Sequence, residues 1–157
     1  MATWNEFESA RPDMAAVLKG ILGWIPIAYL ATVAADGSPR VHPFVPLFAG
    51  RGIFISAIPS PKTRDLLRDG RYAMHALPGK WREVAGSMRG DDEFYMTGRA
   101  KLIEDEETRR AVDAVAKFDV RPQDQVLEME IDKVMTAYWE KVGEPGTSPV
   151  RQFWRAG

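Results

Sequence analysis

The chain has 157 residues, of which 45% are hydrophobic and 27% are charged, the balance of an ordinary globular and soluble protein. A chain of this length is expected to form one domain, residues 1–157, with a sizeable core. The net charge of -1 argues against general attraction to nucleic acid or to an anionic membrane. The absence of cysteine excludes disulfides, thiolate metal sites and cysteine nucleophiles, and it fits a cytoplasmic location.

Residues 1–24 are predicted to form a helical segment. Thr3 and Glu6 have the spacing of a capping box for a short first helical turn. Pro12 suits the first position of a longer helix, which Gly23 should end. The N-terminus lacks the basic-then-apolar order of a signal peptide, and no apolar run is long enough to span a bilayer.

The next segment reads as three strands. Residues 27–34 are rich in β-forming residues, and the turn residues that follow them are a strong hairpin signal. The returning strand, residues 40–48, is interrupted by Pro43 and Pro46. Because proline donates no hydrogen bond to a sheet, we expect this strand at an edge, at a bulge or along a binding surface. Residues 53–57 form a short apolar third strand.

The second half of the chain alternates strands with helices. The pattern predicts a helix over residues 61–68, a fourth strand over 71–77 and a long loop over 78–91. A fifth strand over 93–103 carries Gly98 as a bulge, and a helix capped by Asp105 runs to about Phe118. A sixth, half-buried strand starts near Leu127, and residues 143–157 are expected to form a loosely held tail.

About six antiparallel strands with three peripheral helices make an α+β, mainly β fold. Short hairpin connections favour a closed or partly closed barrel over a sandwich. A doubly wound parallel sheet needs regular alternation of strands and helices, which this chain lacks. No Gly-x-Gly-x-x-Gly motif follows any predicted strand.

The junction between the third strand and the helix at residue 61 is a candidate phosphate site. Ser60 would be the N-cap, with Lys62 and Thr63 in the first turn. Amide donors and the positive end of the helix dipole gather there, and a lysine adds to them. The alternative is an ordinary helix start with a solvated lysine.

Arg40 and His42 share one face of the second strand, because side chains two positions apart point the same way. One interpretation is that they face a ligand near Ser56 and Lys62. The alternative is that they lie on the polar outer side of an antiparallel sheet. The strand's prolines leave backbone groups on the facing chain without partners, which a heteroaromatic ring would satisfy.

Other chemistries find little support in the residues. The two histidines, His42 and His75, lie on separate predicted strands and do not make a metal site. No Gly-x-Ser-x-Gly motif supports a serine hydrolase. Trp81, Trp139 and Trp154 suit a ligand edge, a subunit contact or an ordinary core or surface position.

The order of these motifs resembles that of the pyridoxamine 5'-phosphate oxidase-like, flavin-binding split-barrel superfamily. The resemblance covers roughly residues 27–140, and it rests on an ordered set of segments. These are LATVAADGSPRVHP at 30–43, GIFIS at 52–56, SPKTRDL at 60–66, DGRYAM at 69–74 and EFYMTGRA at 93–100.

The resemblance implies a split β-barrel that works as a homodimer, with FMN in two equivalent clefts between the subunits. Arg40 and His42, with the backbone through Val41, Pro43 and Phe44, would run along the isoalloxazine and the ribityl chain. Ser56 and Ala57 would touch the ribityl or phosphate region. Lys62 and Thr63, beside the N-cap Ser60, would hold the phosphate, and Trp139 would approach from the partner subunit.

The chain departs from the true oxidase at two places. The oxidase's phosphate loop resembles Ser-Arg-Lys, whereas this chain has Ser60-Pro61-Lys62 and so lacks one cation. Residues 148–155 do not match the oxidase's C-terminal substrate signature. We therefore expect an FMN-dependent oxidoreductase of unknown substrate, reduced by a nicotinamide or a hydride-donating substrate, with no evident catalytic acid or base.

Three alternatives stay open from the sequence. A deazaflavin shares the ring plane and a phosphate with FMN, so a deazaflavin-dependent reductase has the same residue requirements. A non-enzymatic flavin- or haem-binding storage, sensor or stress protein uses the same barrel. A protein without a cofactor, active through dimerisation or partner binding, is the third.

Overall fold

The computed structural model of the chain describes residues 1–77, 81–84 and 87–157, and the side chains outside residues 78–91. Within this part it has four helices and nine strands. The helices are α1 (Trp4–Ala10), α2 (Pro12–Trp24), α3 (Pro61–Arg68) and α4 (Glu106–Val115). The strands are β1 (Ala28–Val33), β2 (Pro39–Phe44), β3 (Leu47–Ala49), β4 (Gly52–Ala57), β5 (Arg71–Ala76), β6 (Trp81–Val84), β7 (Ser87–Leu102), β8 (Gln125–Glu140) and β9 (Ser148–Arg155).

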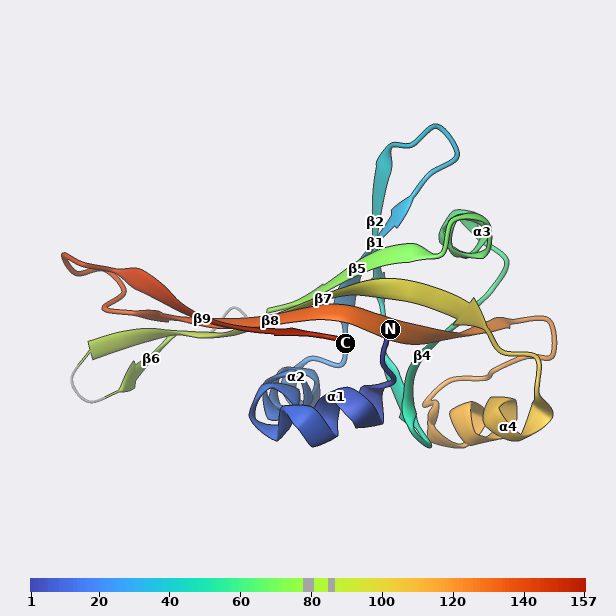
Figure 1. Cartoon of the computed structure of the whole chain (residues 1–157), viewed down its shortest axis with the longest axis horizontal. Coiled ribbons are helices and arrows are strands. Elements are labelled where there is room, and N and C mark those ends of the chain that lie inside the picture. Colours follow the sequence, from blue (N-terminus) through green and yellow to red (C-terminus); the bar gives the residue numbers. More distant parts are fainter. Residues whose placement is uncertain (78–80, 85–86) are drawn as a thin grey trace.

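All strand pairs are antiparallel, and the main path of the sheet runs β2-β1-β5-β7-β8-β4-β3. β6 pairs with β7, and β9 pairs with β8, so both lie off that path. The two longest strands, β7 and β8, run from the helical body into an extended arm that carries β6 and β9 (Figure 1). This mainly β, α+β architecture confirms the expected split barrel.

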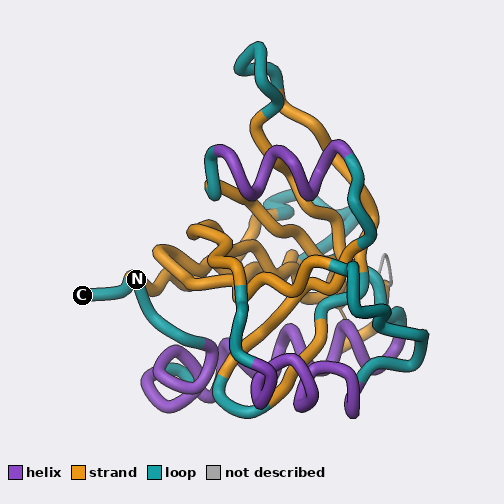
Figure 2. Tube along the Cα trace, turned by 90° about the vertical axis from the view of Figure 1, so that its right-hand side faces the viewer, coloured by secondary structure: helices purple, strands orange, loops and turns teal. Residues whose placement is uncertain are grey.

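Helices cover the sheet unevenly. α1, α2 and α4 lie on one side of β7 and β8, whereas α3 lies on the other side in both views (Figures 1 and 2). The larger core cluster joins Phe7, Met14 and Leu18 to buried strand residues such as Met74 and Met96. A smaller cluster lies under α4. Its members are Leu47, Ala49, Phe54, Ile103, Val112 and Val126.

The helix starts follow from local chemistry as predicted. Thr3 and Glu6 form the capping box of α1, and Pro12 opens α2. Ser60 caps α3, and the Asp105 carboxylate accepts a hydrogen bond from the Thr108 amide at 2.8 Å at the start of α4.

Two predicted helix ends were wrong. α2 continues past Gly23 to Trp24, because the next amide, of Ile25, still donates to the Ile21 carbonyl. α4 ends at Val115 rather than near Phe118, because Ala116 turns to extended backbone.

The prolines of the second strand act as predicted. Pro43 lies in β2, which is one edge of the sheet, and Pro46 separates β2 from β3, which is the other edge. An edge strand has a neighbour on one side only, so a proline there disturbs the sheet less than one in a central strand. The chain therefore passes from one edge of the open barrel to the other through a two-residue link.

Two strands were missed by the sequence pattern, and the expected strand and helix numbers were too low. The segment predicted as a loop over 78–91 contains β6 and the start of β7, while residues 78–80, residues 85–86 and the Trp81 side chain lie outside the described part. The predicted loose tail forms β9, which pairs with β8 from Lys133 to Glu140. Both segments are polar, and their strand form depends on the hydrogen-bonding edges of β7 and β8, which no local pattern records.

Gly98 lies at an irregularity between β7 and β8. Thr97 pairs with Lys133 and Gly98 pairs with Ile131, so Asp132 is the extra residue, on β8. The predicted bulge at Gly98 is confirmed, with the additional residue on the partner strand. A Cβ atom at position 98 would lie 1.8 Å from the carbonyl oxygen of Glu130, so only glycine fits here.

Candidate functional site

A cavity of about 500 Å³ lies where β4 ends, α3 begins and β8 begins. The pairing of Ala57 with Gln125 joins the end of β4 to the start of β8 and so brings two distant chain segments together. Its lining includes five of the residues predicted from the sequence, namely His42, Ser56, Ala57, Ser60 and Lys62. Six further residues complete it, namely Ile58, Pro61, Phe118, Asp119, Arg121 and Asp124.

The first turn of α3 contributes the cationic part of the cavity. Ser60 is the N-cap, and its hydroxyl accepts a hydrogen bond from the Thr63 amide at 3.4 Å. Burial lowers the pKa of the Lys62 ammonium, which has lost part of its water shell. A ligand anion at this position would restore the lost charge stabilisation and would also meet the positive end of the helix.

Thr63 does not line the cavity, although the sequence predicted it as a phosphate ligand. Its side chain is buried, and its hydroxyl donates to the Ile58 carbonyl at 2.8 Å. The same hydroxyl lies 2.8 Å from the Ser60 hydroxyl. Thr63 therefore holds the turn before α3 in shape and leaves Ser60 and Lys62 facing the cavity.

Unsatisfied polar atoms gather around this cavity. Within the described part of the chain, four buried side-chain polar atoms have no hydrogen-bond partner, and three belong to residues that line it. These three atoms are His42 Nε2, Ser56 Oγ and Asp124 Oδ1. Because a buried polar atom without a partner is costly, their concentration at one cavity makes this cavity the candidate ligand site.

The surroundings of His42 favour its neutral form. Burial lowers the pKa of its imidazole, the cations Lys62 and Arg40 lower it further, and the Asp65 carboxylate opposes them. A neutral imidazole offers one donor and one acceptor nitrogen. His42 can therefore form hydrogen bonds with a polar ring edge or a hydroxyl, without adding charge to the cavity.

Arg40 lies on the same face of β2 as His42, as predicted, but it does not line the cavity. Its Nε donates to the Asp65 carboxylate at 2.9 Å. Asp65 is only 3% exposed and also accepts from the Thr32 hydroxyl at 2.9 Å and from Arg68 at 3.3 Å. Burial acts to raise the pKa of Asp65, but the hydrogen bonds from Arg40, Thr32 and Arg68 outweigh it and leave the pKa below its ordinary value.

The remaining predicted residues lie outside the cavity. Val41 and Pro43 point to the exposed side of β2, while Phe44 is buried in the core. Trp139 lies near the far end of β8, fourteen positions from Gln125, which is about 45 Å along an extended strand. Within one subunit the structure therefore does not bring Trp139 to the cavity.

Sequence reasoning missed the wall formed by Phe118, Asp119, Arg121 and Asp124. These residues follow α4 and lie about sixty positions from Lys62 in the chain. Their charges are like those of any solvated loop, and only the pairing of β4 with β8 reveals their position.

No group of three or more histidine, cysteine, aspartate or glutamate side chains in the described part is arranged to hold a metal ion. None of its helices is both long and apolar enough to cross a membrane.

Comparison with known proteins places this geometry in context. Residues 14–138 match the protein family described as pyridoxamine 5'-phosphate oxidase. No curated protein matches the chain.

Solved structures share the fold at low sequence identity. A putative 5-nitroimidazole antibiotic resistance protein from Bacteroides thetaiotaomicron is 18% identical, with a TM-score of 0.62 over 78% of this chain and 82% of its own. A heme binding protein from Mycobacterium smegmatis is 17% identical, with a TM-score of 0.61 over 89% of this chain and 58% of its own. PhzG from Burkholderia lata 383, in complex with tetrahydrophenazine-1-carboxylic acid, is 12% identical, with a TM-score of 0.57 over 98% and 92%.

Proposed function

The chain belongs to the pyridoxamine 5'-phosphate oxidase family, and on this premise we propose that it is a flavoprotein that binds FMN and acts as an oxidoreductase on a small molecule. The observation that carries the proposal is the cavity beside α3. It combines a partly desolvated lysine, a helix start and three buried polar atoms without partners. A ligand with a phosphate, a polar chain and a ring that forms hydrogen bonds would satisfy all of them.

Different residues would hold different parts of FMN. Lys62 and the first turn of α3 would hold the phosphate, and the Ser56 hydroxyl would bond the chain next to it. His42 and the backbone of β2 would border the ring, with Arg40 fixed beside them by Asp65. When bound, FMN supplies hydride or electron transfer, and the protein binds and orients it.

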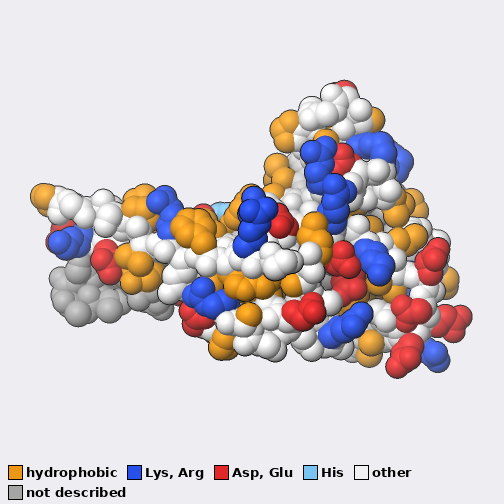
Figure 3. All heavy atoms as spheres, viewed as in Figure 1, with side chains coloured by type: hydrophobic (Ala, Val, Ile, Leu, Met, Phe, Trp, Pro, Cys, Tyr) orange, Lys and Arg blue, Asp and Glu red, His pale blue; other side chains and the backbone are white. Residues whose placement is uncertain are grey.

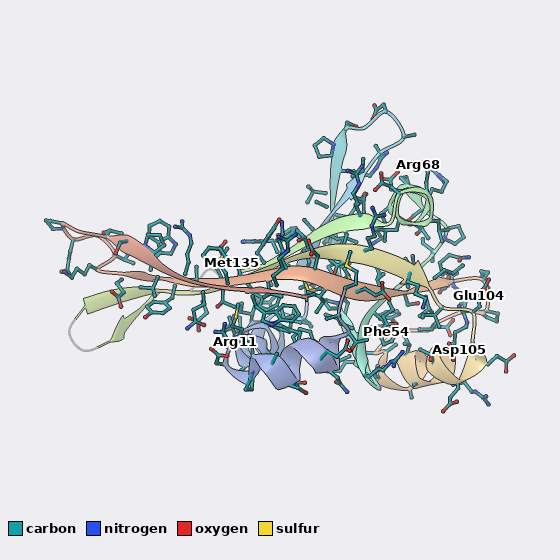
Figure 4. All side chains as sticks on the ribbon, viewed as in Figure 1. Arg11, Phe54, Arg68, Glu104, Asp105 and Met135 are labelled. Atoms are coloured by element: carbon teal, nitrogen blue, oxygen red, sulfur yellow. The ribbon has the colours of Figure 1, made fainter. Side chains whose placement is uncertain are left out.

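A second subunit is part of the proposal. One row of paired residues crosses six strands on the face of the sheet opposite the buried side chains: Pro43, Tyr29, His75, Tyr95, Met135 and Phe153. We call these six residues the outer row. Tyr29 and Phe153 are 55% and 69% exposed. Met135 lies on the side of β8 away from α1 and α2 (Figure 4), and Figure 3 shows hydrophobic side chains among Lys and Arg along the arm.

The outer row supports a homodimer because a line of exposed and half-buried side chains, most of them apolar or aromatic, favours burial against another surface. A second copy bound there would also offer its own arm, with Trp139, to the first subunit. This is the arrangement in which the predicted contact between Trp139 and the flavin becomes possible.

Titration of the apo-protein with FMN tests the cofactor. A charge-assisted hydrogen bond to phosphate contributes about 1.5–3 kcal/mol, so Lys62→Ala should weaken FMN binding about tenfold to a hundredfold. Arg64→Ala is the matched control, because Arg64 is an exposed cation on the same helix that does not line the cavity. Equal affinities for wild type and Lys62→Ala would remove the lysine from the site.

The dimer is tested by sedimentation of variants of the outer row. Tyr29→Glu places a charge at an exposed position of the outer row and should shift a wild-type dimer to monomer at micromolar concentration. Leu67→Glu makes the same kind of change at an exposed leucine on α3, outside the row, and should leave the dimer intact. A wild-type chain that sediments as a monomer at all concentrations contradicts this part of the proposal.

Haem binding is a second candidate. Its support is the buried Nε2 of His42, which has no partner, together with the fold shared with the mycobacterial heme binding protein. The absorption spectrum of the purified protein separates the candidates. Flavin bands indicate FMN, a single violet-shifted band indicates a deazaflavin, and a Soret band that His42→Ala abolishes indicates haem.

A further inference from the structure

The tight turn at residues 121–124 forms part of the cavity wall. The Asp124 amide donates to the Arg121 carbonyl at 2.9 Å, and the Arg121 amide donates to Asp124 Oδ2 at 3.0 Å. Arg109, on α4, donates to the Asp124 carbonyl at 3.0 Å and to the Pro122 carbonyl at 3.3 Å. The turn is therefore held both by its own hydrogen bonds and by Arg109. One oxygen of the Asp124 carboxylate, Oδ2, has its partner inside the turn.

The other carboxylate oxygen lacks such a partner. Asp124 is only 4% exposed, and its Oδ1 accepts no hydrogen bond from the described residues. Its nearest cation is Arg121 Nη2, at 3.6 Å, which is longer than a hydrogen bond. A buried carboxylate oxygen in this state requires a donor.

The chemistry of the cavity indicates which donor is missing. A carboxylate repels a phosphate, so an anion will lie near Lys62 and the start of α3 and away from Asp124. The group beside the phosphate must then carry hydroxyls, because a hydroxyl donates to a carboxylate without adding charge. A phosphorylated polyol chain meets both requirements within one ligand.

We infer that Asp124 is a ligand-binding residue that accepts a hydrogen bond from a hydroxyl of the polyol chain next to the phosphate. This inference rests on the proposed function, in which that chain is the ribityl chain of FMN. Asp124 makes the site selective for hydroxylated ligands, while Lys62 makes it selective for phosphorylated ones. The two selectivities are separable because they involve different groups of one molecule.

Three flavins test the assignment: FMN, riboflavin, which lacks the phosphate, and lumiflavin, which lacks the polyol chain. In Asp124→Asn the side-chain carbonyl must keep accepting from the Arg121 amide, so the NH₂ group replaces the acceptor Oδ1. We expect the preference for riboflavin over lumiflavin to fall about tenfold in this variant. The preference for FMN over riboflavin should stay as in wild type.

Asp113→Asn is the matched control. Asp113 is exposed on α4 and does not line the cavity, so this variant makes the same change of charge without removing a buried acceptor. Both preferences should stay at their wild-type values. If Asp113→Asn changes the preference for riboflavin as much as Asp124→Asn does, the effect comes from overall charge and the inference is overturned.

A second measurement needs no variant, in case Asp124→Asn fails to fold. A flavin with an unhydroxylated alkyl phosphate chain should bind the wild-type protein at least tenfold more weakly than FMN. Equal binding overturns the role of Asp124 while FMN binding, and with it the proposed function, stands. If the wild-type protein binds none of these flavins, the proposed function and the inference fail together.

Discussion

Two buried carboxylates lie near α3, and they differ in how they are satisfied. Asp65 and Asp124 are 3% and 4% exposed. Asp65 accepts hydrogen bonds from Thr32, Arg40 and Arg68, so the protein itself satisfies both of its oxygens. Asp124 has one oxygen that accepts a hydrogen bond within its own turn and one for which the described residues supply no donor.

Under the proposed function, the difference separates groups that hold the fold from groups that a ligand would satisfy. Asp65 ties β1, β2 and α3 together and keeps Arg40 in place. His42 Nε2, Ser56 Oγ and Asp124 Oδ1 form no hydrogen bond within the described part of the chain, so their burial reduces the stability of the free chain. Substitutions around Asp65 should therefore lower the stability of the fold. Substitutions around the cavity should instead lower the affinity for the ligand.

The largest effect on stability is expected for Asp65→Ala. This change leaves the buried Thr32 hydroxyl without an acceptor and two arginines without their anion, and it should lower the free energy of unfolding by about 2–4 kcal/mol. Urea denaturation measures the loss. Asp13→Ala removes an exposed pair with Arg11 and should cost far less. Equal losses in the two variants would end the distinction between Asp65 and a surface charge.

A smaller, pH-dependent effect is expected for Asp65→Asn. The pKa of Asp65 lies below its ordinary value of 3.8, so its contribution to stability is complete above about pH 4 and is lost as the pH falls through the lowered pKa. At pH 7 the variant should be less stable than wild type by about 1–3 kcal/mol. This difference in the free energy of unfolding should become steadily smaller below pH 4. A gap that stays constant down to pH 2 would show that charge is not what Asp65 contributes.

The smallest effect on stability is expected for Ser56→Ala, on the cavity side. Because the Ser56 hydroxyl is buried without a partner, removing it should change the free energy of unfolding of the apo-protein by no more than about 0.5 kcal/mol, or stabilise it slightly. The same variant should bind FMN about tenfold more weakly. A clear loss of stability without loss of FMN affinity would move Ser56 from the ligand site to the fold.

The helices could be predicted because their signals are local. Thr3 with Glu6, Ser60 with Pro61, and Asp105 each mark a helix start within four residues of sequence. The hairpin between β1 and β2 is equally local, and its Gly37 has a positive φ of 84°. β9 could not be predicted in this way, because its partners lie on β8 at the far side of a turn-rich segment.

The candidate site was likewise predictable only where local signals mark its residues. His42, Ser56 and Lys62 were predicted to lie close together, and all three line the cavity. The prediction used the face of the strand on which a side chain lies and the position of one helix start. Arg121 and Asp124 come from a loop whose position depends on the pairing of β4 with β8, a contact between residues about seventy positions apart. Local residue patterns contain no signal for that pairing, so four of the eleven lining residues appeared only in the structure.

The absent side chain of Gly98 has a consequence for the shape of the molecule. The Glu130 carbonyl turns into the space that a Cβ would occupy, where it accepts a hydrogen bond from the Tyr72 hydroxyl at 3.1 Å. β7 and β8 change register at this point, within the body of the sheet, where Gly98 also pairs with Tyr72 of β5. Any larger residue at position 98 would force β7 and β8 apart beside the buried Ile131, so the packing of the core depends on this glycine.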